Sequence, residues 1–267
     1  MSKPAIGLGF ALALLFATAA AAQDDDAARA SRWADLRQTL FGDKQVLNGD
    51  GKIALEAPDR ALDAALVPVT ITVQNPKDVT ALYLVIDDNP APVAAHVTYG
   101  PAGDPRSLKL RVRINQYTNM HAVEETAQGE LYEVSRFIKA SGGCSAPAGS
   151  YDAAALADIG QMKLRPIGEA DASDSFEAQI LIRHPNFNGM QMDQVTRLYT
   201  PARFLKTIAI SRDGETVLQL ESDISLATDP AITFAIKGQK KGKLAITAKD
   251  SENAVFEHIF DLDQQGS

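Results

Sequence analysis

Residues 67–73 read Val-Pro-Val-Thr-Ile-Thr-Val, and this alternation of apolar and polar side chains decides the fold class. Successive side chains of a β-strand point to opposite faces, so a period of two predicts a strand with one buried face. Residues 108–114 repeat the pattern. Leu108, Leu110, Val112 and Ile114 are predicted inside and Lys109, Arg111 and Arg113 outside. Residues 81–87, 94–99 and 131–139 are further candidate strands.

A second series of candidate strands lies in the other half of the chain, at residues 176–183, 205–211, 215–221, 231–237, 243–249 and 255–261. Asp213-Gly214, between two of these strands, is a strong hairpin signal. Strands at short spacing, with polar turns and no long helix between them, favour antiparallel sandwiches over a parallel α/β sheet. We therefore predict an all-β protein with two small antiparallel β-sandwich domains.

The first 22 residues have the features of a secretory signal peptide. Lys3 gives a positive start, residues 6–16 are apolar, and Ala20-Ala21-Ala22 forms a cleavage site. A membrane anchor is the alternative, but a span needs about 20 strongly apolar residues and this stretch is shorter. We expect cleavage, Sec-type export, a periplasmic protein and no membrane association after cleavage.

The remaining chain is predicted to contain two domains and a connector. Residues 23–144 form the first domain, which starts with a short helix between Ser31 and Gly42. Residues 145–174 form the connector, with a short helix over residues 153–164 followed by a polar linker. Residues 175–267 form the second domain.

Composition and motifs exclude several function classes. The chain has 267 residues, of which 45% are hydrophobic and 22% charged, and its net charge of −8 is unsuited to neutralising nucleic-acid phosphates. It has no Gly-x-Ser-x-Gly turn, and its four histidines are scattered. We therefore predict no catalytic residues, no cofactor, no nucleic-acid partner and no metal motif. A metal site assembled only in three dimensions stays open.

Cys144 is the single cysteine of a chain predicted to be exported. A buried small hydrophobe is the common fate of a free cysteine. Gly142 and Gly143 before it and Ser-Ala-Pro-Ala-Gly after it cannot supply apolar walls, so we expect an exposed thiol on a flexible arm. Lys139 is the one ionisable residue within five positions on either side, and its charge favours the thiolate.

The residues up to Cys144 resemble the end of SoxY, the sulfur carrier subunit of bacterial thiosulfate oxidation, whose arm ends in Gly-Gly-Cys-Gly-Gly. In the second half, several motifs resemble its partner SoxZ. They are His184-Pro185, residues 199–204 with the sequence Tyr-Thr-Pro-Ala-Arg-Phe, residues 222–225 with the sequence Ser-Asp-Ile-Ser, and Asp229-Pro230. The order Y then Z resembles the fused SoxYZ-like carriers associated with quinoprotein dehydrogenases. The resemblance implies two immunoglobulin-like sandwiches.

The same resemblance implies a carrier protein that is not an enzyme. Cys144 would bind a sulfur-containing or related electrophilic group covalently and present it to periplasmic sulfur-oxidation enzymes or to a quinoprotein dehydrogenase and cytochrome system. The chain departs from the family pattern in two ways. The family arm ends the chain, whereas here Ser145-Ala146-Pro147 follows Cys144, so the arm is attached at both ends. The signal peptide also lacks a twin arginine. One alternative is a non-covalent adaptor of a quinoprotein alcohol dehydrogenase in which the thiol is incidental. Another is a redox enzyme that forms a mixed disulfide, although the sequence lacks a second cysteine.

Overall fold

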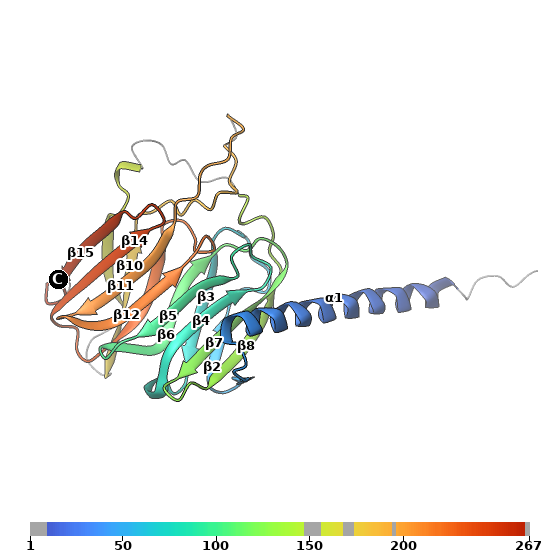
Figure 1. The fold of residues 1–267 in the computed structure, drawn as a ribbon, viewed down its shortest axis with the longest axis horizontal. Coiled ribbons are helices and arrows are strands. Elements are labelled where there is room, and N and C mark those ends of the chain that lie inside the picture. The colour runs from blue at the N-terminus through green and yellow to red at the C-terminus, as the bar shows by residue number, and fades with distance from the viewer. Residues whose placement is uncertain (1–9, 147–155, 168–173, 194–195, 265–267) are drawn as a thin grey trace, which may run out of the picture. The chain divides into compact units, whose positions relative to one another are not determined.

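The computed structural model describes residues 10–146, 156–167, 174–193 and 196–264, and its chain divides into two compact units (Figure 1). The first unit, residues 1–43, contains the helix α1 (Phe10–Phe41). This helix ends where the sequence predicts, because Gly42 adopts a positive φ of 60° that favours glycine at a helix end. Its first residue is Phe10, well before Ser31. No helix in the described ranges is long and apolar enough to span a membrane.

The second unit, residues 44–267, contains all the strands and is built from two sheets. The larger sheet has nine strands, which in spatial order are β1 (Val46–Asn48), β8 (Leu131–Ile138), β7 (Thr118–Thr126), β4 (Val79–Ile86), β5 (Val93–Tyr99), β12 (Glu215–Ser222), β11 (Leu205–Arg212), β14 (Lys243–Asp250) and β15 (Val255–Asp261). Its pairs are antiparallel except for β1 and β8.

The smaller sheet has six strands, all paired antiparallel. In spatial order they are β2 (Ile53–Glu56), β3 (Val67–Val73), β6 (Gly103–Val112), β13 (Ala231–Lys237), β10 (Ser175–Ile182) and β9 (Met162–Ile167). A short 3-10 helix, η1 (Pro76–Asp78), precedes β4. The predicted all-β class is confirmed, and the buried apolar faces of both sheets form the core.

Both sheets run without a break from the first half of the chain into the second. In the larger sheet β5 pairs with β12, and Val97 lies opposite Leu220. In the smaller sheet β6 pairs with β13, and Leu108 lies opposite Phe234. Figure 1 shows β5 beside β12, where the green part of the ribbon meets the orange part. The two halves are therefore joined by backbone hydrogen bonds in both layers.

The structure differs from the predicted elements in the connector. The predicted helix over residues 153–164 is wrong at its end, where Met162 opens strand β9; residues 147–155 lie outside the described part of the chain. Met162 and Leu164 are buried while Lys163 and Arg165 are exposed, which is the period of a strand paired on one side with β10. Most of the predicted polar linker before β10 also lies outside the described residues.

Candidate functional site

The predicted arm does not stand away from the sandwich. The N–H of Gly142 donates to the carbonyl oxygen of Asn115 at 2.8 Å, and the N–H of Gly143 donates to that of Ile114 at 2.9 Å. Both acceptors belong to the chain that follows β6. A Cβ atom on Gly143 would lie 2.0 Å from the carbonyl oxygen of Ala64, so this glycine permits a close backbone approach. Gly143 therefore serves the close packing of this segment against Ala64.

Cys144 is buried, with 0% of its surface exposed, so the prediction of an exposed thiol is wrong. The physical reason is that residues far away in the sequence enclose the cysteine, whereas its small neighbours cannot. The side-chain amide of Asn188 donates a hydrogen bond of 2.6 Å to the carbonyl oxygen of Cys144. Asn188 belongs to the second half of the chain, so the cysteine lies at the junction of the two halves.

Arg113 is the charged side chain of this junction. The alternating pattern predicts it to be exposed, but it is 1% exposed, because β6 ends at Val112 and the chain then leaves the sheet. Its guanidinium donates to the carbonyl oxygens of Ile224 and Leu226 and, at 2.7 Å, to the hydroxyl of Thr228. Arg113 therefore reaches from the first half of the chain into a loop of the second.

Two opposing effects set the reactivity of the Cys144 thiol. Burial raises its pKa above the ordinary value, and the positive charge of Arg113 offsets part of this rise. The thiol is therefore protonated and unreactive at neutral pH in this conformation. Lys139 was predicted to favour the thiolate, but Arg113 is the cation among the described residues that acts on the pKa of the thiol.

The loop of the second half that contacts Cys144 through Asn188 carries several buried amide side chains. Asn186, Asn188 and Gln191 have 0%, 4% and 3% of their surfaces exposed. The Asn188 N–H donates to Gln191 Oε1 at 3.3 Å, and Asn188 Oδ1 accepts from the Met190 N–H at 2.9 Å. These bonds fix the amide of Asn188 so that its Nδ2 faces the Cys144 carbonyl. The sequence does not predict this contact, since no local pattern links positions 44 residues apart.

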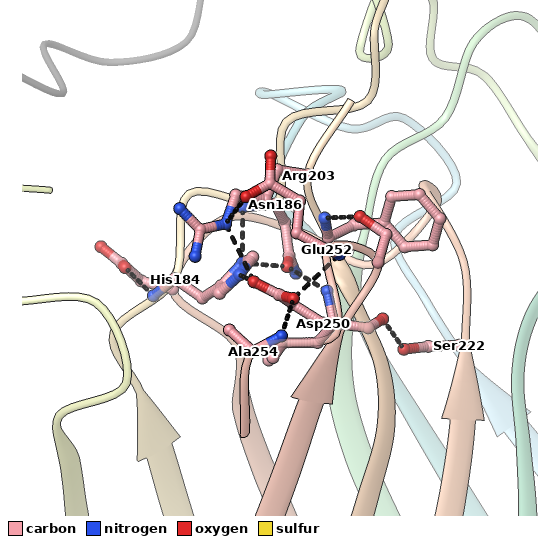
Figure 2. Close-up of polar contacts among 11 residues, drawn as sticks. His184, Asn186, Arg203, Ser222, Asp250, Glu252 and Ala254 are labelled. Atoms are coloured by element: carbon pink, nitrogen blue, oxygen red, sulfur yellow. Dashed lines mark hydrogen bonds and ion pairs between the residues drawn. The ribbon is translucent and has the colours of Figure 1, made fainter. Parts of the chain in front are cut away.

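A buried polar network lies at the start of this loop (Figure 2). His184 Nδ1 lies 2.7 Å from Asn186 Oδ1, and Asn186 Nδ2 donates to the Ala227 carbonyl oxygen at 2.8 Å. Arg203 Nε donates to Asp250 Oδ2 at 2.9 Å, which places an ion pair beside the imidazole. Burial lowers the pKa of His184, so its ring is neutral at pH 7. The network fixes the base of the loop that holds Cys144.

A second buried histidine lies in the larger sheet, away from the predicted site residues. His121 on β7 lies 3.1 Å from Asp87 Oδ2 and 2.6 Å from Glu133 Oε1. Burial opposes a charge on this ring, but the two carboxylates outweigh it and raise the pKa of His121. Among the described residues, no group of three or more His, Cys, Asp and Glu side chains is placed to hold a metal ion.

Comparison with known families identifies both halves of the chain. Residues 37–144 match the model of the sulfur oxidation protein SoxY, and residues 164–261 match that of the sulphur oxidation protein SoxZ. The chain therefore carries a SoxY domain followed by a SoxZ domain. Cys144 is the last residue of the SoxY match, and Asn188 and Thr228 lie within the SoxZ match. The contacts around the cysteine are thus contacts between the SoxY and SoxZ domains.

Two solved structures illustrate the similarity. The sulfur carrier protein SoxY from Chlorobium limicola f thiosulfatophilum is 27% identical, and the alignment covers 44% of this chain and 99% of that chain with a TM-score of 0.39. A superoxide reductase (neelaredoxin) from Ignicoccus hospitalis is 15% identical over 33% of this chain and 79% of its own, with a TM-score of 0.29. No curated protein matches the chain.

Proposed function

We propose that this protein is a sulfur carrier that binds a sulfur-containing group covalently on Cys144 and presents it to partner enzymes of sulfur oxidation. The observation that carries the proposal is the tandem of SoxY and SoxZ domains with the one cysteine of the chain at the end of the SoxY match. A carrier needs a nucleophile that can be shielded and delivered, and no catalytic apparatus of its own. We further propose that it acts after export to the periplasm.

The buried position of Cys144 gives this carrier a closed state. A thiol with no exposed surface and a raised pKa resists alkylation and oxidation. Delivery requires an open state in which the contacts of Gly142, Gly143 and Cys144 with Asn115, Ile114 and Asn188 are broken. The carrier thus exchanges between a protected conformation and a reactive one, and a partner that binds the open state shifts this equilibrium.

The proposal is tested by intact-mass spectrometry of protein isolated without reductant from host cells that are oxidising thiosulfate. We expect a mass increase that corresponds to a sulfur-containing adduct, that maps to Cys144 and that dithiothreitol removes. The Cys144→Ser variant, matched in size, should lack the adduct and should not support thiosulfate oxidation. An unmodified Cys144 in active cells, together with full activity of Cys144→Ser, would contradict the carrier function and favour a non-covalent adaptor.

A further inference from the structure

The chain segment against which the cysteine packs is itself held by the SoxZ domain. Residues 113–115, called the support segment below, follow β6 and accept the hydrogen bonds from the N–H groups of Gly142 and Gly143. In the same segment, the N–H of Arg113 donates to the carbonyl oxygen of Ser225 at 2.8 Å. Ser225 lies within the SoxZ match and is 0% exposed. A SoxZ loop therefore holds the segment that holds the cysteine.

Asn89 joins the parts of this junction. It lies in the turn between β4 and β5, and 4% of its surface is exposed. Its Nδ2 donates to the carbonyl oxygen of Arg113 at 2.7 Å and to Ser225 Oγ at 2.9 Å. Its Oδ1 accepts from the Asn115 N–H at 2.9 Å. The Ser225 hydroxyl in turn donates to the carbonyl oxygen of Ala91 at 2.8 Å. One amide side chain thus binds both ends of the support segment and the SoxZ loop.

The partners of Asn89 require an amide at this position. The Arg113 carbonyl oxygen can only accept a hydrogen bond and the Asn115 N–H can only donate one, so the side chain between them must supply one donor and one acceptor. An ionised aspartate has the same shape but presents an acceptor to the Arg113 carbonyl oxygen. Because the site is buried, water does not replace the lost bond.

We propose that Asn89 is a positioning residue of the carrier, which couples the SoxZ loop to the support segment and thereby keeps residues 142–144 closed. When Ser225 parts from Asn89, the carbonyl oxygens of Ile114 and Asn115 lose their alignment with Gly143 and Gly142, and the thiol becomes accessible. The SoxZ domain then controls access to Cys144 through a second contact besides the bond from Asn188. The biological meaning of this inference rests on the proposed carrier function, but closure is a property of the purified protein.

The test measures alkylation of Cys144 by iodoacetamide, in which the thiolate displaces iodide, by intact-mass spectrometry at several urea concentrations below the unfolding transition. Opening of residues 142–144 alone exposes little surface, so labelling by this route hardly changes with urea, whereas labelling through global unfolding rises steeply. In the wild-type protein we expect a slow rate that is independent of urea at low urea concentration. A steep dependence down to zero urea would overturn the proposal, because the thiol would then be exposed only when the whole unit unfolds.

Variants then assign the control of opening to Asn89. Asn89→Asp should raise the urea-independent rate about tenfold, since a buried group left unsatisfied costs about a factor of ten or more in an equilibrium. Ser225→Ala removes only the SoxZ hydroxyl and should raise this rate about fivefold, as the loss of one ordinary hydrogen bond does. Asn253→Asp, at an exposed position in the turn between β14 and β15, is the matched control and should label like wild type.

The urea dependence separates a positioning role from a merely structural one. If Asn89→Asp and Ser225→Ala move the unfolding midpoint to lower urea but leave the urea-independent rate at its wild-type value, Asn89 contributes only to global stability and the proposal is overturned. If Asn89→Asp does not fold, the same comparison with Ser225→Ala decides. Faster labelling of the variants without any adduct in cells would refute the carrier function alone, and adducts in cells with unchanged labelling would refute the role of Asn89 alone.

Discussion

Asn188 contacts Cys144, the proposed carrier residue, through a side-chain hydrogen bond of 2.6 Å from its amide to the Cys144 carbonyl. Replacing Asn188 by Ala leaves this buried carbonyl without that donor, a loss of about 1–3 kcal/mol. We expect the open state to become about tenfold more populated and the thiol to react with iodoacetamide about tenfold faster. Gln116→Ala, an exposed amide near the same loop, is the control. An unchanged rate in Asn188→Ala would show that this bond does not hold the closed state.

His121 is expected to make stability fall as pH rises. Its pKa is raised in the folded protein by Asp87 and Glu133, the titratable groups that face it from the end of β4 and from β8. The stabilisation is therefore complete below the unfolded pKa, about 6.5, and is lost as pH rises through the folded pKa. Urea unfolding between about pH 6 and 8, below the range in which thiols titrate, measures this loss.

His121→Gln should remove the decline, because glutamine can accept and donate hydrogen bonds but does not titrate. The stability contribution of His184 has the opposite pH dependence. Burial lowers the pKa of this histidine, so its contribution to stability is lost as pH falls through about 6.5. Stability of the His121→Gln variant should therefore rise slightly or stay level over the same range. An equal decline in the variant would show that His121 is not the titrating group.

At the scale of elements, the segment after β8 lies tightly against the chain that follows β6. A Cβ on Gly143 would lie 2.0 Å from the Ala64 oxygen and 2.7 Å from the Ile114 oxygen, both backbone atoms that cannot move cheaply. Gly143→Ala should destabilise the closed segment by about 1–3 kcal/mol and accelerate thiol labelling, as overpacking does elsewhere. Ser141→Ala, an exposed position in the same segment, should not change the rate. Slow labelling of Gly143→Ala would mean that the segment can shift without opening.

The elements that could be predicted from the sequence are those with one buried face. β3 and β14 alternate cleanly and lie where the pattern places them. β7 was missed because His121 and Glu124 are buried on it together with Met120 and Val123, so polar residues do not mark an exposed face. Its burial on both faces depends on neighbouring strands, which no local pattern reports.

The lone cysteine, its glycines and the SoxY resemblance all lead to Cys144 as the candidate carrier residue, and this role stays a prediction. The predicted exposure of its thiol is wrong. Asn188 contacts the Cys144 backbone and Arg113 contacts Thr228, and both contacts arise only when the SoxY and SoxZ domains come together. The alternating pattern of residues 108–114 places Arg113 on the exposed face. Arg113 is buried instead, because β6 ends at Val112 and the alternation ends with it.

At the scale of the whole strand-bearing unit, continuity of the sheets makes the two domains one cooperative structure. Breaking the junction exposes the edges of β5, β6, β12 and β13 and uncovers Cys144 at the same time. Exposed edges with unpaired backbone groups are costly in water and prone to association. We therefore expect neither domain to keep its stability without the other.

Phe234→Ala tests this cooperativity from the core of the junction. Phe234 on β13 is 0% exposed and lies opposite Leu108 of the SoxY domain, so truncation should cost about 3–5 kcal/mol. Urea unfolding followed by circular dichroism and by Cys144 labelling should give one coincident transition, shifted to lower urea. Ile259→Ala on the exposed edge strand β15 is the control, and its unfolding free energy should change by less than about 0.5 kcal/mol. Two separate transitions, with the thiol exposed in the first, would instead mean that the domains part before either unfolds, which would make domain separation itself the route by which the carrier opens.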